Sequence, residues 1–109
     1  MYYTYDEAVS QFGDKLPTRE QFEELQAFCT WTWNGKGYVV KGDNGNSIVL
    51  PAAGYRYCNG DMGGVGSFGY YWSSTPYASA SAFRLGFDSS GVDIFFDHRC
   101  DGQSVRLVQ

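Results

Sequence analysis

The sequence predicts a small α+β domain in which two N-terminal helices precede a turn-rich antiparallel sheet. Three observations support this fold class: helical apolar spacing near the N-terminus, strand-like alternation after residue 29, and an abundance of glycine and aromatic residues. Aromatic residues make up 18% of the 109 residues, and there are 14 glycines, a composition unlike that of a helical bundle or a disordered chain. A chain of this length can bury one core, so we predict a single domain over residues 1–109.

Two capping patterns predict two short helices. Thr4 and Glu7 stand three residues apart, which is the spacing of a capping box. Thr18 and Gln21 repeat this pattern, and Gly13 is a natural stop between the two segments. The apolar residues of the first helix recur on one face: Tyr5, Ala8, Val9 and Phe12. The apolar stripe of the second helix is Phe22, Leu25 and Cys29.

The later part of the chain has the pattern of short strands separated by turns. Segments 38–41 and 47–50 flank the sequence Gly-Asp-Asn-Gly-Asn, and Asn-Gly readily adopts the positive φ of a tight hairpin turn. Glycines dominate residues 53–69, which predicts a long irregular loop. Further strands are expected over residues 70–74, 83–87, 92–96 and 104–108. The tryptophans are expected to fill the core and not to stack on sugar rings: Trp31, Trp33 and Trp72.

The charge balance excludes several classes of partner. The formal net charge is −4, whereas nucleic acids and anionic membrane surfaces attract basic patches. No stretch approaches the roughly 20 apolar residues of a membrane span, and the first residues have neither the basic region nor the apolar run of a signal peptide. We therefore expect no nucleic-acid partner and no membrane insertion.

Little in the sequence points to catalysis or to metal binding. The chain has an odd number of cysteines, and they lack Cys-x-x-Cys spacing: Cys29, Cys58 and Cys100. We therefore expect reduced thiols, two of them buried, and neither a disulfide framework nor a zinc site. His98 stands two residues before Cys100, but no third residue or oxyanion hole completes a nucleophilic pair. The Asp-Asn-Gly-Asn run at residues 43–46 lacks the length and terminal glutamate of a calcium loop. We predict no catalytic residue, metal or cofactor.

Three segments carry a resemblance to a known family. They read LPTREQFEEL at residues 16–25, GYYWSST at 69–75 and GQSVRLV at 102–108. Over nearly its whole length the chain resembles the Fibrobacter succinogenes major paralogous domain family, which is similar to the lectin-fold variable proteins of diversity-generating retroelements. The resemblance implies a C-type-lectin-like fold, with two helices packed on a small mixed, mostly antiparallel sheet and long irregular loops. It also implies scaffold roles for Trp72, Ser73, Ser74, Leu85, Phe87, Val92, Ile94, Val105 and Arg106.

The same resemblance implies a variable ligand-binding region over residues 77–101. In the retroelement proteins, adenines in the corresponding segment are randomised, and AAC-type codons changed in this way cannot encode Lys, Glu, Gln, Met or Trp. None of these five residue types occurs in residues 77–101, although each occurs elsewhere in the chain. A short β segment also lacks Lys and Glu for ordinary reasons.

The expected ligand contacts are the residues of this region that alternate with scaffold positions. If the strand near residues 92–96 is regular, its even-numbered residues point inward and Phe95 points to solvent between two aspartates. The alternative is a bulge that buries both Phe95 and Phe96. An exposed aromatic ring beside small polar groups is typical of a paratope. The predicted ligand-binding residues are Tyr77, Ser79, Ser81, Arg84, Gly86, Asp88, Asp93, Phe95, Phe96, Asp97, His98, Cys100 and Asp101.

The sequence therefore favours a non-enzymatic binding module. Its ligand would be a protein or a glycan on a target surface, and the domain would be displayed on a virion or a bacterial cell. The alternatives are a structural or adhesive surface domain without diversification and a glycan-binding lectin of the same fold. Because exposed contacts tolerate substitution, we expect changes at these positions to leave stability nearly unchanged: Arg84, Asp93, Phe95, Asp97, His98, Cys100 and Asp101.

Overall fold

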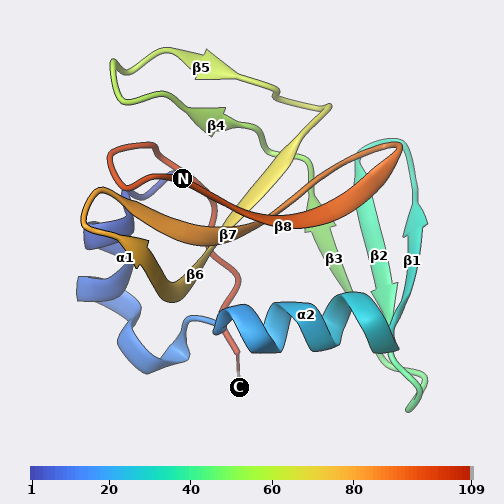
Figure 1. The fold of residues 1–109 in the computed structure, drawn as a ribbon. Coiled ribbons are helices and arrows are strands. Elements are labelled where there is room, and N and C mark those ends of the chain that lie inside the picture. Colours follow the sequence, from blue (N-terminus) through green and yellow to red (C-terminus); the bar gives the residue numbers. More distant parts are fainter. Residues whose placement is uncertain (109) are drawn as a thin grey trace.

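The computed structural model describes residues 1–108, which form a small α+β domain with two helices and mostly antiparallel sheets (Figure 1). The predicted α+β class is confirmed, and so is the order of helices before strands. Among the described residues, no helix combines the length and the apolar character needed to cross a bilayer.

Both helices begin at the predicted capping boxes. In α1 (Tyr5–Phe12) the Thr4 side chain accepts a hydrogen bond from the third helical residue, and the reciprocal bond is also present. Thr18 does the same for α2 (Arg19–Phe28). A short 3₁₀ turn (Gly13–Lys15) separates the two helices. These caps satisfy backbone N–H groups that a helix leaves without partners at its first turn.

The strands form three sheets. The first contains β1 (Thr30–Trp33), β2 (Gly37–Lys41) and β3 (Ser47–Pro51), in that order. The Asn-Gly hairpin between β2 and β3 is confirmed, because Gly45 adopts a φ of 85° in its turn. The second contains β4 (Tyr55–Arg56) and β5 (Met62–Gly63), a short ladder inside the predicted irregular loop. The third contains β6 (Gly69–Ala78), β7 (Ser81–Asp88) and β8 (Gly91–His98).

The strand predicted over residues 104–108 does not form. Three successive residues instead bridge three different segments: Gly102 to Arg56, Gln103 to Tyr3 and Ser104 to Tyr71. Of these, only Ser104 lies in the predicted strand, and Val108 at its other end donates its backbone N–H to Lys15 in another segment. No single strand therefore runs alongside residues 104–108 to form a ladder. Arg106, which the resemblance assigns to the scaffold, is consequently exposed.

The sheet of β6, β7 and β8 lies between two layers. Figure 1 shows α2 below β7 and β8 and β4 above them. The core on the α2 side consists of Phe22, Tyr38, Val40, Leu50, Ala52, Tyr71, Leu85 and Phe87. The core beneath α1 consists of Tyr5, Ala8, Leu16, Trp72 and Ala82, whereas Val9 is exposed. Trp72 is fully buried and Trp31 and Trp33 pack against the first core, as expected for core tryptophans.

Candidate ligand-binding surface

The predicted region is organised by the hairpin of β7 and β8. Asp88 pairs with Gly91 across a two-residue turn, and the pairing then continues without a register shift to Ser81 and His98. This regular ladder excludes the bulge that would bury both phenylalanines. Phe95 is 52% exposed, as predicted from strand alternation.

Arg84 is a buried cation that forms ion pairs with two aspartates of β8. Its Nε donates to Asp97 Oδ2 and its Nη1 donates to Asp93 Oδ1, both at 2.8 Å. Its guanidinium also lies 4.5 Å from the centroid of the Tyr70 ring. Burial disfavours the charged form, but the carboxylates of Asp97 and Asp93 outweigh this effect and raise the pKa of Arg84. The guanidinium therefore remains charged although only 7% of the residue is exposed.

The expectation that Arg84 and Gly86 are exposed is wrong, because the Tyr70 ring of the neighbouring strand β6 lies against both of them. The Tyr55 ring packs on the Tyr70 ring at a centroid distance of 4.8 Å. A Cβ atom at Gly86 would overlap the Arg84 guanidinium and the Tyr70 ring. Both positions are thus set by packing.

A tyrosine pair forms the outer part of this cover. The hydroxyls of Tyr55 and Tyr57 lie 3.0 Å apart, and their rings meet edge to face. The hydrogen bond to Tyr57, together with burial, raises the pKa of Tyr55 to about 12. The phenol therefore stays protonated at neutral pH.

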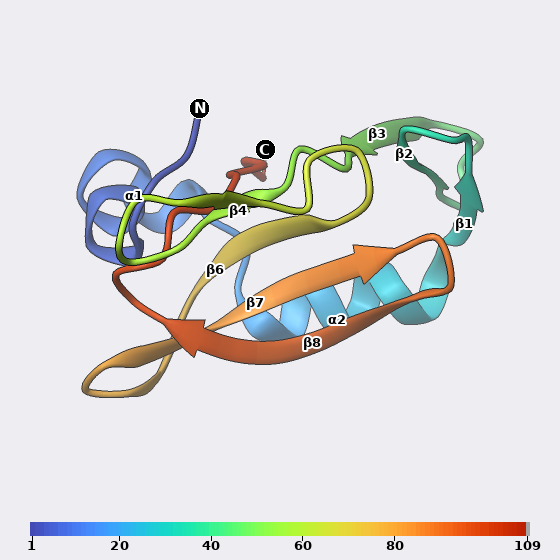
Figure 2. The same ribbon diagram turned by 90° about the horizontal axis from the view of Figure 1, so that it is seen from above.

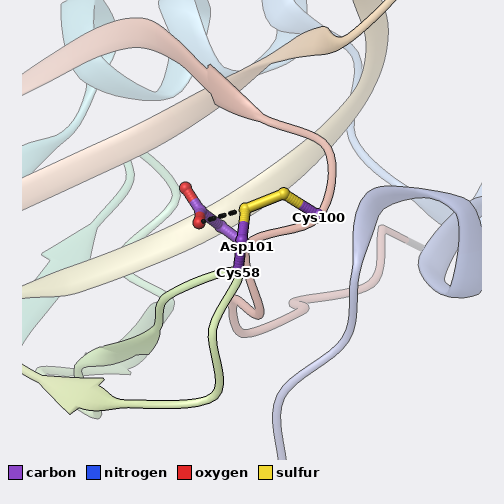
Figure 3. Close-up of side chains that lie close together, drawn as sticks. All are labelled: Cys58, Cys100 and Asp101. Atoms are coloured by element: carbon purple, nitrogen blue, oxygen red, sulfur yellow. Dashed lines mark hydrogen bonds between the residues drawn. A yellow bond between two sulfur atoms is a disulfide. The ribbon is translucent and has the colours of Figure 1, made fainter.

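A disulfide joins Cys58 to Cys100, residues that are 42 positions apart (Figure 3). The prediction of reduced thiols is wrong for these two cysteines, and both are exposed instead of buried. Cys29 remains a free, half-buried thiol. The bridge between Arg56 and Gly102 brings the two cysteines together, a long-range contact that an odd cysteine count does not reveal. Cys100 also has no thiol with which to form a nucleophilic pair with His98.

Asp101 lies against the disulfide. Its Oδ1 is 3.2 Å from Cys58 Sγ (dashed in Figure 3), but a disulfide sulfur carries no proton, so this is a close contact and not a donated hydrogen bond. Burial and the neighbouring Asp97 carboxylate raise the pKa of Asp101. Although Cys58, Cys100 and Asp101 could form a metal-ligand cluster by distance alone, the bonded sulfurs offer no thiolate, which is the form that binds metal.

The rings of Tyr77, Phe95 and Phe96 form an aromatic patch next to β8. The Tyr77 ring stacks on Phe96 at a centroid distance of 4.0 Å, and Phe95 lies 4.4 Å from Phe96. Tyr77 is 54% exposed and Phe95 is 52% exposed, whereas Phe96 is half-buried between them. The patch thus presents two rings to solvent, each held by a neighbouring ring.

The other predicted contacts differ in exposure. Ser79 and His98 are exposed, and Ser81 is half-buried. Asp88 accepts hydrogen bonds from the Ser90 hydroxyl at 2.6 Å and the Ser90 backbone N–H at 2.9 Å. These bonds lower the pKa of Asp88. Its carboxylate therefore stabilises the hairpin turn.

An open depression of about 320 Å³ lies between this turn and the ion pair. Its lining includes Tyr70, Arg84, Gly86 and Asp93 on the sheet and Ser90 on the turn. The exposed Asp93 carboxylate stands on the same face of β8 as Phe95, two residues away. A ligand seated on Phe95 would therefore meet a carboxylate at this side.

Residues 31–108 match a family described as a domain of unknown function, DUF8237. The chain belongs to the DUF8237 family. The DUF8237 region contains the whole candidate surface and the disulfide, and the two N-terminal helices precede it. No curated protein and no solved structure matches the chain.

Proposed function

We propose that this DUF8237 domain is a non-enzymatic binding module that holds a protein or glycan ligand through the exposed side chains of β8 and its flanking turns. The observation that carries the proposal is the aromatic patch. Exposed aromatic rings supply contact area at a low cost in side-chain entropy, and small polar groups beside them supply adaptable hydrogen bonds. Here the rings are flanked by Asp93 and His98, which are exposed.

The proposed contact set is narrower than the predicted one. It comprises Tyr77, Ser79, Asp93, Phe95, Phe96, Asp97 and His98. Arg84, Gly86 and Cys100 belong to the buried network and the disulfide that support this surface. Asp97 serves both roles, because it binds Arg84 and lies on the same face as Phe95.

We further propose that the domain has a C-type-lectin-like fold and is the variable protein of a diversity-generating retroelement, displayed on a virion or a bacterial cell. Two observations support this. The five residue types that adenine randomisation cannot create are missing from residues 77–101. Along β8, exposed residues alternate with residues that pack on the core, as Ile94 does, which would let the surface vary while the scaffold remains.

The genomic surroundings test the retroelement proposal. A neighbouring reverse transcriptase gene and a near-repeat of the 3′ end, differing only at adenines, are the expected result. A locus without both would contradict diversification and favour a fixed adhesive domain of the same architecture.

A substitution tests the binding role itself. Glycan arrays and displayed protein libraries would be screened with the wild-type chain, and each hit measured again with Phe95→Ala and with Val49→Ala. Val49 is an exposed apolar residue on β3, away from the patch, so it controls for a general loss of apolar surface. We expect at least tenfold weaker binding for Phe95→Ala, because central aromatic contacts contribute about 2 kcal/mol or more. Equal loss in both variants would contradict the proposed surface, and hits confined to one sugar class would favour a lectin.

A further inference from the structure

Strand β8 forms the free edge of its sheet. The strand order is β6, β7 and β8, and Figure 2 shows β8 along the outer side of β7. The opposite edge is occupied, because Trp72 and Ser74 of β6 donate backbone hydrogen bonds to Ser104 and Pro17. Only β8 leaves a long row of backbone groups open at this sheet, within residues 1–108.

The direction of these groups follows from the register. Asp88 and Gly91 pair across a two-residue turn, so hydrogen-bonded pairs with β7 recur at every second residue from Gly91. The N–H and C=O groups of Ile94 and Phe96 therefore point away from β7. The Gln26 side chain confirms this geometry, because its Nε2 donates to the outward carbonyl of Val92 at 2.9 Å.

Beyond Val92, where Gln26 of α2 reaches the edge, β8 carries two aspartates but lacks the features that most strongly block strand pairing. Natural sheets block free edges with lysine, proline, a bulge or a very short strand. Residues 91–98 contain neither lysine nor proline, and their eight positions pair with β7 without a register shift. An edge of this kind is a template for another strand.

The side chains along the edge select the chemistry of that strand. On one face, Asp93, Phe95 and Asp97 alternate with inward residues, and the Asp93 side chain is 68% exposed. The single positive charge of Arg84 neutralises one of the two negative charges of Asp93 and Asp97. The half-buried Asp101, which follows the end of β8, adds another acidic group. This leaves an acidic edge with an apolar centre.

A second copy of the chain fits this edge poorly. In the antiparallel register centred on Phe95, each Asp93 faces the Asp97 of the other copy, and like charges placed opposite each other are destabilising. The net charge of −4 adds long-range repulsion between copies. The charge pattern instead matches a basic segment.

We propose that β8 binds an extended segment of a partner protein by strand addition, with Lys or Arg opposite the two aspartates and an apolar residue over Phe95. The inference rests on the proposed binding role of this surface and adds the conformation and charge of the ligand. Backbone hydrogen bonds to Ile94 and Phe96 would supply affinity, and the alternate side chains would supply specificity.

Three synthetic heptapeptides test the proposal on the whole chain. The first has lysine at its second and sixth positions and valine elsewhere, so that its central valine can lie over Phe95 with a lysine opposite each aspartate. The second has glutamate in place of lysine, and the third is the lysine peptide with N-methyl groups on the backbone amides that would face β8. NMR would follow amide hydrogen exchange, and titrations would give Kd. We expect the lysine peptide at about 1 mM to protect the amides of Ile94 and Phe96, and the other two peptides to leave them unprotected.

Matched variants test the charge. Asp93→Asn is expected to weaken binding of the lysine peptide about two- to fivefold, as for a partly exposed ion pair. Asp43→Asn makes the same change in the turn between β2 and β3 and should leave the Kd unchanged.

Several results would overturn strand addition. They are equal binding of the glutamate peptide, undiminished binding of the N-methylated peptide, and unprotected Ile94 and Phe96 amides with the lysine peptide. A concentration-dependent dimer that protects the same amides without peptide would make a second copy the occupant. Binding of a glycan or a displayed protein that depends on Phe95 could still be observed after any of these results. Failure of strand addition at β8 and failure of the proposed binding function are therefore distinguishable.

Discussion

Arg84 shows how a single side chain can depart from the alternation of its strand. Its position predicts a solvent-facing residue, and Phe95, which pairs with it across the hairpin, does face solvent. Arg84 is buried because the Tyr70 ring of β6 lies against its guanidinium and the Tyr55 ring packs on Tyr70. The acidic partners were visible in the sequence, but the rings that cover Arg84 come from other segments, and the periodicity of one strand carries no information on them.

Removing this guanidinium should destabilise the domain. Arg84→Met leaves the carboxylates of Asp93 and Asp97 without their cation, but both keep contact with solvent, so the expected cost is that of lost charged hydrogen bonds, roughly 1.5–3 kcal/mol. Urea unfolding measures the change in the free energy of unfolding. Arg106→Met, at an exposed position, serves as the control and should change it by less than about 0.5 kcal/mol. Equal midpoints for the two variants would show that Arg84 is not structural.

Asp101 should make stability depend on pH in the opposite sense to most carboxylates. Its pKa is raised above the ordinary value of 3.8, so the folded state holds the proton more tightly than the unfolded state. Stability from this group is therefore present below pH 3.8 and is lost as the pH rises through the folded pKa. Asp101→Asn removes the charge and should be the more stable protein at neutral pH, with the difference shrinking toward acid. Urea unfolding at neutral and at acid pH would measure the difference in the free energy of unfolding between the two proteins. A difference that grew toward acid would contradict the raised pKa of Asp101.

At the scale of elements, local signals placed the helices and the first hairpin correctly. The two capping boxes and the Asn-Gly turn depend on residues within a few positions of one another. The strand predicted over residues 104–108 failed because its backbone partners lie in separate segments, β6 for Ser104 and Lys15 for Val108. Apolar alternation indicates which residues are buried, but it does not say whether one partner strand continues alongside.

The cap of α2 offers a direct test of the local signal. Thr18→Ala removes the oxygen that accepts from the Gln21 backbone N–H at 3.1 Å, and the loss of an N-cap costs about 1 kcal/mol. Thermal unfolding should register this decrease. Ser10→Ala, at an exposed position inside α1, makes a similar change without removing a cap and should leave the transition nearly in place. A smaller effect at Thr18 than at Ser10 would argue against the cap.

At the scale of the whole molecule, the candidate surface depends on contacts that close the chain on itself. Sequence alone predicted the exposed Phe95 and the residues around it, because they follow from the alternation of one strand. It missed the disulfide and the two packed tyrosine rings that bury Arg84, since both depend on which segments meet in space. The Cys58–Cys100 disulfide joins the β4–β5 loop to the segment after β8, and the bridge between Tyr3 and Gln103 joins that segment to the N-terminus.

The disulfide should contribute substantially to stability. Closing a loop of 42 residues reduces the entropy of the unfolded chain by an amount worth about 4 kcal/mol. Cys58→Ser is therefore expected to lower the melting temperature strongly under oxidising conditions, whereas Cys29→Ser, which removes the free thiol, should have a small effect. A thiol titration of the denatured, unreduced protein should find one free thiol per chain. Three thiols would contradict the disulfide.

The burial of Trp72 has an optical consequence. Its indole lies under α1 and donates to the Tyr3 carbonyl at 2.8 Å, whereas Trp31 and Trp33 belong to the other core and are partly exposed. Emission from the domain is therefore the sum of a blue component from one end and a redder component from the other. A dissolved quencher such as iodide would reach the second and spare the first, so fluorescence can report which half of the protein loosens first.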